Sequence, residues 1–312
     1  MKKTIALLCG GISSEREVSL KSGRQVLESL DKEKYEVRQY DPQSDLPRLV
    51  GDASRIDAAL ILLHGPYGED GTIQGLLELL DIPYQGAGVL GSALAMNKLA
   101  TKQMYERWGI PTPPYLAARR TDSVDADQWV QRLGLPLVVK PVIGGSSIGM
   151  TIVRAPDQLG AAMAKAFEQD HTVLVESYVQ GTEITGGVLG NDRLESLPLI
   201  EIIPDPHHEF FDYEAKYTAG ITQEICPALI SPALTEKAQT CARMAHQALF
   251  CKGYSRTDMI LRDEEIFVLE TNTIPGMTPT SLFPQSARAA GISFGRLLDR
   301  LIELGIEAHG KR

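Results

Sequence analysis

The chain has 312 residues, 43% of them hydrophobic, and a formal net charge of −9 at pH 7. A chain of this length can bury a large core and suggests two or three domains. The acidic balance, with no basic run longer than Lys2-Lys3, excludes a nucleic acid or an anionic membrane as the expected main partner.

The first apolar run, residues 5–9, follows two lysines and imitates a signal peptide. It is shorter than the ~7–15 residues of a signal core and ends in Gly-Gly, so we predict a buried first strand. The other apolar runs are far shorter than the ~20 residues that span a bilayer. The four cysteines form no CxxC pair, which indicates neither a zinc site nor a disulfide framework. We therefore expect a cytoplasmic protein with reduced cysteines and no membrane partner.

Residues 1–96 alternate strand and helix signals. We predict strands over residues 5–8, 35–40 and 58–63, and helices over residues 15–30 and 72–80. This alternation is typical of an α/β fold with a parallel sheet.

Two loops of this first part carry candidate functional residues. In "CGGISSEREVSL", Ser14 and Glu17 match a capping box, which explains Glu17 as a helix cap and leaves Glu15 without a structural role. His64 ends the third strand in "LHGPYGEDGTIQG", at the edge where α/β sheets bind ligands, although a lone histidine is more often structural. Neither a Walker A nor a GxGxxG motif is present, so the sequence does not support a dinucleotide fold.

In residues 97–182 the pattern changes to short strands around a helix. We predict strands over residues 136–141, 148–153 and 173–176, and a helix that begins at residue 156 and places Leu159, Met163 and Phe167 on one face. The stretch "VVKPVIGGSSIGMTIV" links two strands through Gly-Gly-Ser-Ser, beside Lys140. Its unblocked N–H groups suit a phosphate, and an ordinary glycine hairpin is the alternative.

The stretch "TVLVESYVQGTE" ends the last of these strands. Open backbone groups at a strand end suit an adenine edge, and a nearby carboxylate suits ribose hydroxyls. An ordinary hinge between domains is the alternative.

Residues 183–312 contain further strands and two long helices. We predict strands over residues 183–189, 197–203, 254–261 and 266–271, and helices over residues 232–250 and 293–304. Residues 204–222 show no clear period and are predicted to form a long loop, which in a compact domain is usually functional or disordered.

The strands "YSRTDMIL" and "EIFVLETNT" carry the strongest local signal. A three-residue turn over residues 263–265 would pair Arg256 with Asn272 and Asp258 with Glu270. Two adjacent carboxylates need a cation between them, and oxygen ligands without His or Cys favour Mg²⁺. A solvent-facing polar stripe with an Arg–Asp salt bridge is the alternative.

A period of two in the second strand also assigns Ile266 and Val268 to the same face as Glu270 and Asn272. The loop "NTIPGMTPTSLFP" follows directly. Its Gly276 N–H and Ser281 hydroxyl could hold a carboxylate or an oxyanion, although Pro-Gly turns are common.

Together these motifs resemble the D-alanine–D-alanine ligases of the ATP-grasp superfamily over essentially the whole chain. The motifs that carry the resemblance are "GGISSEREVSL", "LHGPYGEDGTIQGLLE", "NKLATKQM", "KPVIGGSSIGM", "EAKYTAG", "GYSRTDMIL" and "ETNTIPGMTPTSLFP". The resemblance implies an N-terminal parallel α/β domain followed by a two-lobed, α+β ATP-grasp fold. The implied domains are a substrate domain (1–96), a central subdomain with a phosphate lid (97–182) and a C-terminal subdomain with the metal site and a covering loop (183–312).

The implied reaction joins two D-alanines into D-alanyl-D-alanine through an acyl phosphate, and it converts ATP into ADP and phosphate. The resemblance further implies two Mg²⁺ ions, with Mn²⁺ as an alternative, a homodimer, and a role in peptidoglycan precursor synthesis in the cytoplasm.

The resemblance also assigns roles to individual residues. ATP binding falls to Lys98, Lys140, Ser146, Ser147, Glu176, Tyr178, Val179, Glu183 and Lys216. Metal binding falls to Asp258, Glu270 and Asn272. The first D-alanine would be bound by Glu15 and His64, and the second by Ser281 and Leu282. In catalysis, Arg256 and the Gly276 N–H stabilise the oxyanion, and Tyr217 and Ser146 bond with Glu15.

The sequence departs from the family pattern at a few positions. Asn97 stands where the family usually has Asp, and Gly144 where an acidic residue is common. Gly186 and Gly187 interrupt a strand that is usually richer in β-branched residues. These departures are expected to lower the affinity for ATP or to loosen the packing of the central domain.

Two other functions remain open on the sequence. One is a related ligase whose second substrate is D-lactate or another amino acid, although the tyrosine of "EAKYTAG" argues against the hydroxy acid. The other is a non-catalytic sensor of nucleotides or amino acids on the same scaffold. The intact set of Lys, Asp, Glu, Asn and Arg argues against a sensor.

Overall fold

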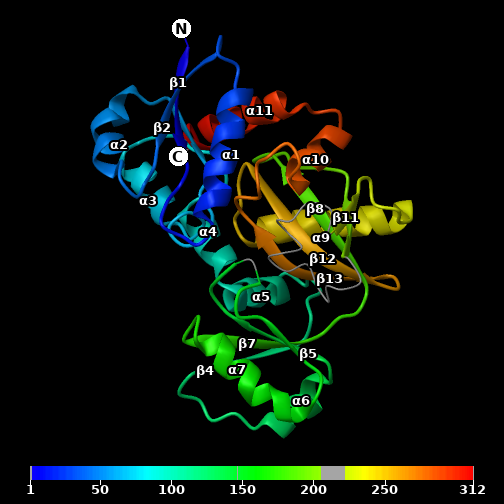
Figure 1. Cartoon of the computed structure of the whole chain (residues 1–312). Coiled ribbons are helices and arrows are strands. Elements are labelled where there is room, and N and C mark those ends of the chain that lie inside the picture. The colour runs from blue at the N-terminus through cyan, green and yellow to red at the C-terminus, as the bar shows by residue number, and fades with distance from the viewer. Residues whose placement is uncertain (1, 146, 205–221, 312) are drawn as a thin grey trace.

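The computed structural model describes residues 2–145, 147–204 and 222–311. These residues form three sheets with their covering helices, as the sequence predicted for a mixed α/β protein. In Figure 1 the N-terminal sheet (blue) and the central sheet (green) lie at opposite ends, with the C-terminal sheet between them. No helix in these ranges is long and apolar enough to cross a bilayer.

The N-terminal sheet is parallel, as predicted, with the strand order β2–β1–β3. Its strands are β1 (Lys3–Leu8), β2 (Tyr35–Tyr40) and β3 (Ala58–Ile61). One face packs on α1 (Arg16–Ser29) and on the C-terminal helix α11 (Phe294–His309), and the other packs on α2 (Leu46–Asp52) and α3 (Thr72–Leu79). Because both faces are covered, β1 is a continuous apolar run rather than an alternating one.

The central sheet is antiparallel in the order β4–β7–β5–β6. Its elements are β4 (Tyr115–Arg119), α6 (Ala126–Leu133), β5 (Leu137–Pro141), β6 (Thr151–Val153), α7 (Leu159–Phe167) and β7 (Thr172–Ser177). Strand β6 begins three residues later than predicted, since Ser147 and Gly149 take positive φ angles of 59° and 76° in a turn. The predicted strands on either side of the glycine-serine loop are confirmed as β5 and β6, which pair antiparallel.

The C-terminal sheet has the order β11–β10–β8–β12–β13, and β9 pairs with β8. Its elements are β8 (Thr182–Leu189), β9 (Glu195–Ser196), β10 (Ile200–Pro204), β11 (Thr222–Ile225), α9 (Pro232–Ala248), β12 (Tyr254–Arg262), β13 (Glu265–Asn272) and α10 (Leu282–Ala289). The strand predicted over residues 197–203 is therefore wrong in its first half. Pro198 lies in the gap between β9 and β10, where a residue without an N–H cannot extend a ladder.

The two glycines in β8 have a packing reason. A Cβ atom on Gly186 would lie 3.0 Å from Leu199, and one on Gly187 would lie 3.1 Å from Leu197 and Phe283. Larger residues would push these apolar side chains apart. The Gly-Gly pair thus lets neighbouring layers approach β8 closely rather than marking a loose strand.

Helices α4 (Val89–Met96) and α5 (Lys98–Arg107) connect the N-terminal and central sheets. The Asn97 Oδ1 accepts a 2.9 Å hydrogen bond from the Ala100 N–H, so Asn97 caps α5 as an aspartate would. Tyr105 is fully buried, and its hydroxyl lies 2.7 Å from the Thr271 hydroxyl of β13. This contact fixes α5 against the C-terminal sheet.

Candidate active site

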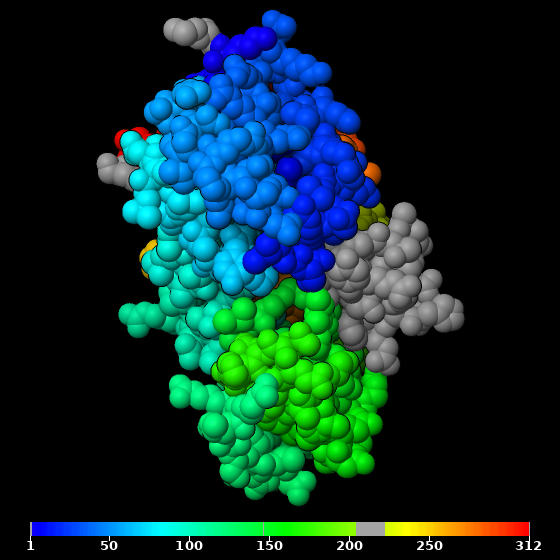
Figure 2. Space-filling model, turned by 60° about the vertical axis from the view of Figure 1, so that its left-hand side comes forward, coloured from blue at the N-terminus to red at the C-terminus, as the bar shows by residue number. Residues whose placement is uncertain are grey.

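A cavity of about 630 Å³ lies where the N-terminal loops, the start of α5 and the C-terminal sheet meet. In Figure 2 the N-terminal surface (blue) and the central surface (green) adjoin each other near the middle of the molecule. Residues far apart in the sequence line this cavity. Those that the sequence singled out are Glu15, His64, Lys98, Arg256, Glu270, Asn272, Gly276, Ser281 and Leu282.

The hairpin of β12 and β13 pairs Arg256 with Asn272 and Asp258 with Glu270, as predicted. The route to this register differs from the prediction. Arg262 pairs with Glu265 across a two-residue turn, and a bulge after Asp258 adds the missing residue on β13.

The bulge also reverses the faces of β13. Ile266 and Val268 are buried in the apolar core with Met259, whereas Glu270 and Asn272 line the cavity. The prediction that these four β13 residues share one face is wrong, because the extra residue breaks the period of two. One strand thereby serves the core with its first half and the cavity with its second.

Asp258 is almost fully buried, and among its partners in the described residues are three side chains that donate hydrogen bonds to it. The Arg256 guanidinium binds it with Nε at 2.9 Å from Oδ1 and a terminal nitrogen at 2.7 Å from Oδ2. The Thr185 hydroxyl donates at 2.6 Å and the Asn272 amide at 3.0 Å. This two-point contact with the arginine fork fixes both the carboxylate and Arg256.

No group of three or more His, Cys, Asp or Glu side chains in the described parts of the chain is arranged as a metal site. Asp258, Glu270 and Asn272 nevertheless offer two carboxylates and an amide at adjacent sheet positions. Mg²⁺ prefers such hard oxygen donors and commonly takes one or two carboxylates together with substrate phosphates. The donor chemistry of these three residues therefore fits a magnesium ion whose other ligands are water and phosphate.

Glu15 ends the loop that precedes α1. It occupies the N-cap position itself without a side-chain capping bond, so the predicted capping box at Ser14 and Glu17 is wrong. Its carboxylate lies close to two glycines from other loops, because a Cβ atom would stand 3.2 Å from it on Gly65 and 3.6 Å from it on Gly145. The small residues leave room for this buried carboxylate at the meeting point of three loops.

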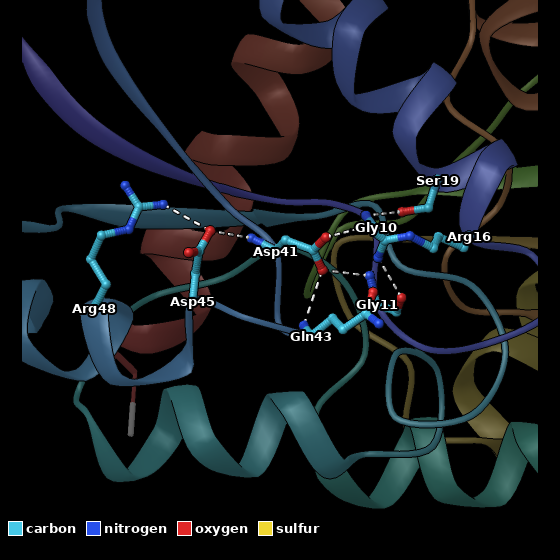
Figure 3. A network of polar contacts seen from close by, with 8 residues as sticks. All are labelled: Gly10, Gly11, Arg16, Ser19, Asp41, Gln43, Asp45 and Arg48. Carbon is cyan, nitrogen blue, oxygen red and sulfur yellow. Dashed lines mark hydrogen bonds and ion pairs between the residues drawn. The ribbon is translucent and has the colours of Figure 1, made fainter.

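A hydrogen-bond network built on Asp41, at the end of β2, holds the loop before Glu15 (Figure 3). The Asp41 carboxylate accepts from the Gly11 N–H at 2.9 Å and from Arg16 at 2.6 Å, and Arg16 also donates to the Gly11 carbonyl. A Cβ atom on Gly10 would lie 2.6 Å from Asp41, so only glycine fits there. The network fixes the glycine turn that presents Glu15.

His64 and Glu69 form the acid-base part of the cavity wall. Burial lowers the pKa of His64, and its Nε2 has no hydrogen-bond partner among the described residues. Glu69 accepts a 2.7 Å hydrogen bond from the Gly65 N–H. Burial raises the pKa of Glu69 to about 8, and the nearby Glu15 and Glu270 carboxylates add to the shift. Both side chains are therefore uncharged near neutral pH.

The loop between β13 and α10 forms the opposite wall. Gly276 lies beside Ser281, since a Cβ atom on the glycine would stand 3.0 Å from the serine hydroxyl oxygen. That hydroxyl lies 2.8 Å from the Thr278 hydroxyl and accepts from the Thr278 N–H at 3.2 Å. Ser281 is the N-cap residue of α10, and Leu282 begins the helix in contact with Ile200 and Ile202.

The predicted phosphate-binding lysines lie on either side of the glycine-serine loop. Lys98 begins α5, and its Nζ donates to the Gly144 carbonyl, so the departure at Gly144 leaves a backbone contact in place. Lys140 lies on β5 and forms an ion pair with Glu176 of β7. The second oxygen of Glu176 lies 2.8 Å from the Nζ of Lys102.

The remaining predicted nucleotide residues that the structure describes lie outside the cavity lining. Tyr178 and Val179 follow β7, where the Tyr178 N–H donates to the Pro136 carbonyl at 3.0 Å. Glu183 lies in β8, and Ser147 lies in the turn before β6. Ser146, Lys216 and Tyr217 lie outside the described residues.

Sequence reasoning missed Asp41, Glu69 and Lys102. Glu69 lay within a quoted motif and Lys102 lay four residues after Lys98, which on a helix means the same face. Asp41 follows directly after a predicted strand, where α/β sheets commonly place ligand or loop contacts. The place of each residue in the sequence was thus the only indication of its role.

Comparison with known proteins gives one consistent match. A family model described as "D-ala D-ala ligase C-terminus" matches residues 104–303, and one described as "D-ala D-ala ligase N-terminus" matches residues 4–47 and 41–87. A D-alanine–D-alanine ligase of Syntrophobacter fumaroxidans is 64% identical over 98% of both chains. One of Desulfotalea psychrophila is 52% identical over 99% of this chain and 97% of its own.

Solved structures give the same result. The D-alanine–D-alanine ligase of Bacillus anthracis superposes with a TM-score of 0.89 at 39% identity over 99% of both chains. A structure of that enzyme complexed with ATP superposes with a TM-score of 0.87 at 36% identity and the same coverage.

Proposed function

Because the chain belongs to the D-alanine–D-alanine ligase family, we propose that it joins two D-alanines into D-alanyl-D-alanine at the expense of ATP, which becomes ADP and phosphate. The observation that carries this proposal is the single cavity wall shared by Glu15, Lys98, Arg256 and Glu270. This wall brings together an anion, two cations and a carboxylate that can bind a metal ion. A ligase that activates a carboxylate with phosphate needs all of these.

On the nucleotide side, Lys98 and Lys140 hold phosphate oxygens, and the loop from residue 144 to residue 147 covers them. The backbone at Tyr178 and Val179 meets the adenine, and Glu183 meets the ribose. Glu176 was expected to meet the adenine as well. Its carboxylate is engaged by Lys102 and Lys140, which leaves it a supporting role beside the nucleotide.

Asp258, Glu270 and Asn272 would hold two Mg²⁺ ions, which neutralise phosphate charge when bound. Arg256 already supplies a positive charge to Asp258. We infer that Arg256 then turns toward the substrate, where it stabilises developing negative charge.

On the amino-acid side, Glu15 pairs with the ammonium of the first D-alanine beside His64, and Ser281 with Leu282 holds the second D-alanine. A carboxylate oxygen of the first D-alanine attacks the γ-phosphorus of ATP, and ADP leaves. The neutral amine of the second D-alanine then attacks the acyl carbon, and the tetrahedral intermediate expels phosphate, which leaves with the proton that the nitrogen loses. Arg256 and the Gly276 N–H stabilise its oxyanion. Ser146, Lys216 and Tyr217 lie outside the described residues, so for them we propose only what the sequence resemblance implies: Lys216 would serve the nucleotide, and Tyr217 and Ser146 would bond with Glu15.

Water exclusion follows from the same arrangement. An acyl phosphate hydrolyses readily, so the intermediate needs a closed, dry site. Three loops meet around the Glu15 carboxylate, and their close approach supports a role of this part of the cavity wall in excluding water.

The wider setting is also part of the proposal. We infer three units with boundaries near residues 96 and 182, a homodimer, a cytoplasmic location and a role in peptidoglycan precursor synthesis. The three separate sheets support the division into units. Gel filtration with light scattering would test the dimer.

Release of phosphate from ATP, measured with D-alanine, L-alanine or D-lactate as the substrate, tests the activity. We expect release with D-alanine and little with L-alanine. D-lactate together with D-alanine should give little depsipeptide. ATP binding with no phosphate release under any condition would instead indicate a sensor, and preferred depsipeptide formation would indicate a ligase for a hydroxy acid.

A further inference from the structure

Lys102 is a buried lysine that the proposed reaction does not use. Its side chain is 1% exposed, and its Nζ lies 2.8 Å from Glu176, 2.7 Å from the Thr112 hydroxyl and 3.3 Å from the Pro113 carbonyl. The ammonium also lies 5.2 Å from the centre of the Tyr115 ring. Burial lowers the pKa of Lys102. A buried ion pair is often no more stable than an apolar replacement, so fold stability alone does not explain this residue.

Glu176 lies between two lysines from different elements. One of its carboxylate oxygens contacts Lys102 of α5 and the other contacts Lys140 of β5. Burial by itself raises the pKa of Glu176, but the two lysines together lower it to about 2. The group of three side chains therefore carries two positive charges and one negative charge, a net charge of +1.

The surplus charge lies toward solvent. Lys140 is 12% exposed, whereas Lys102 and Glu176 are 1% and 4% exposed. Lys140 also stands at the end of β5, directly before the loop whose Gly144 carbonyl accepts from Lys98. Without Lys102, Glu176 and Lys140 would form a neutral pair with little attraction for an anion.

We propose that Lys102 is a positioning residue for nucleotide binding: it shares the charge of Glu176, so that the Lys140 ammonium keeps a net positive charge for the phosphates of a nucleoside triphosphate. This inference rests on the proposed ATP-dependent function, and it assigns to α5 a second lysine with a role at the same site.

The test measures binding of ATP and of adenosine to the full chain by calorimetry, without D-alanine and hence without turnover. For Lys102→Met we expect ATP affinity to fall by about 10- to 100-fold, which is the effect of weakening one charged hydrogen bond between Lys140 and a phosphate. Adenosine affinity should change by less than about threefold. Adenosine carries no phosphate and so does not need the surplus charge. An equal loss for both ligands would mean a merely structural role and would overturn the proposal, as would unchanged ATP binding.

A double variant gives the sharper result. Lys102→Met with Glu176→Gln removes one charge of each sign and leaves Lys140 with its full positive charge. We expect it to recover most of the lost ATP affinity. It has no unpaired buried carboxylate, so it also serves if the single variant does not fold. ATP binding as weak in the double variant as in the single one, or far below wild type where only the double variant folds, would contradict the proposal.

Two further variants complete the design. Lys102→Arg keeps the charge and should retain ATP affinity within about fivefold. Lys165→Met removes an exposed lysine from α7 in the same unit and should leave ATP binding unchanged. Wild-type protein that does not bind ATP at all would overturn the proposed function itself. Wild-type binding together with an unaffected Lys102→Met variant would overturn only the role of Lys102.

Discussion

Two glutamates in different regions of the molecule differ in charge near neutral pH, one being neutral and the other negative. Glu69, in the N-terminal wall of the cavity, has one backbone donor and two carboxylates nearby, and its pKa is raised to about 8. Glu176, in the central sheet, lies between two lysines, and its pKa is lowered to about 2 despite its burial.

The difference between the two regions comes from their neighbours rather than from depth. Glu69 is half-buried and Glu176 is buried, and loss of hydration favours the neutral acid in each case. Around Glu69, the Glu15 and Glu270 carboxylates raise the pKa further against the opposing charge of Arg256, whereas around Glu176 the two lysines lower the pKa. The first region is thus suited to cations such as an ammonium or Mg²⁺, and the second to the phosphates of a nucleotide.

The largest expected effect comes from removing Glu270, one of the two carboxylates near Glu69. Glu270→Gln should lower kcat by at least about 100-fold, because one proposed metal ligand is lost and phosphate charge is less well neutralised. Steady-state kinetics with saturating Mg²⁺ would measure it. Glu265→Gln, an exposed change on the same strand, is the matched control. Equal kcat values for both variants would remove Glu270 from the metal site.

The two lysines that contact Glu176 are expected to affect the binding of ATP rather than that of D-alanine. Lys140→Ala should raise the KM for ATP by about 10- to 100-fold, since a charge facing the phosphates is lost. It should also lower the free energy of unfolding by about 1–3 kcal/mol, because Glu176 keeps only one of its two cations.

Kinetics at varied ATP and a urea titration would measure both changes for Lys140→Ala. Wild-type values for ATP affinity and turnover would rule out the proposed role of Lys140.

A smaller effect is expected from the network that holds the Glu15 loop. Asp41→Asn keeps the shape but weakens the bonds from Arg16 and the Gly11 N–H. We expect the KM for D-alanine to rise by about 5- to 20-fold, while the KM for ATP stays within about twofold. Asp45→Asn, at the outer end of the same network, should change neither value. A change confined to ATP would show that the loop serves the nucleotide side.

The smallest effect concerns pH. Folded Glu69 keeps a proton up to about pH 8, whereas an unfolded glutamate loses it near 4.5. The folded state therefore binds more protons in this range, and stability should fall as the pH rises. His64 and His246 have lowered pKa values and act in the opposite direction, but only below about pH 6.5.

Urea unfolding of the wild type and of Glu69→Gln between pH 6.5 and 8 isolates the contribution of Glu69, because the cysteines, whose pKa values are also raised by burial, act equally in both proteins. Wild-type protein should lose about 1–2 kcal/mol over this range, and Glu69→Gln should lose much less. Glu264→Gln, an exposed change, should behave as wild type. An identical slope in the wild type and Glu69→Gln would mean that Glu69 is ionised throughout.

The sequence was informative where one strong pattern decides the structure. The apolar run of β1 and the alternation of strands and helices predicted the parallel sheet. The pairs Arg256–Asn272 and Asp258–Glu270 were also predicted correctly, although the turn was not. A bulge leaves no signature in a period-two pattern, because the apolar residues before it and the polar residues after it can each be placed on either face.

Other features depend on contacts between distant segments. The charge states of Glu69 and Glu176 follow from residues brought in by other strands and loops, which local sequence does not reveal. The packing of Gly186 and Gly187 likewise depends on Leu197, Leu199 and Phe283. Strand propensity predicts that a glycine destabilises a strand, whereas close packing in this structure requires glycine at both positions.

The bulge in β13 has a consequence for how this segment can vary. Loops generally accept insertions and deletions, because their length rarely decides which way a distant side chain points. In β13, deletion of Leu269 would leave an uninterrupted ladder in which Val268 still pairs with Met259 and Glu270 with Asp258, so the core side chains and the cavity side chains would keep their faces. Loss of one residue is therefore compatible with both faces only at the bulge, where Leu269 is the extra residue. Elsewhere between the turn and Asn272, substitution is the expected route of change, because a shift by one residue would turn side chains to the other face.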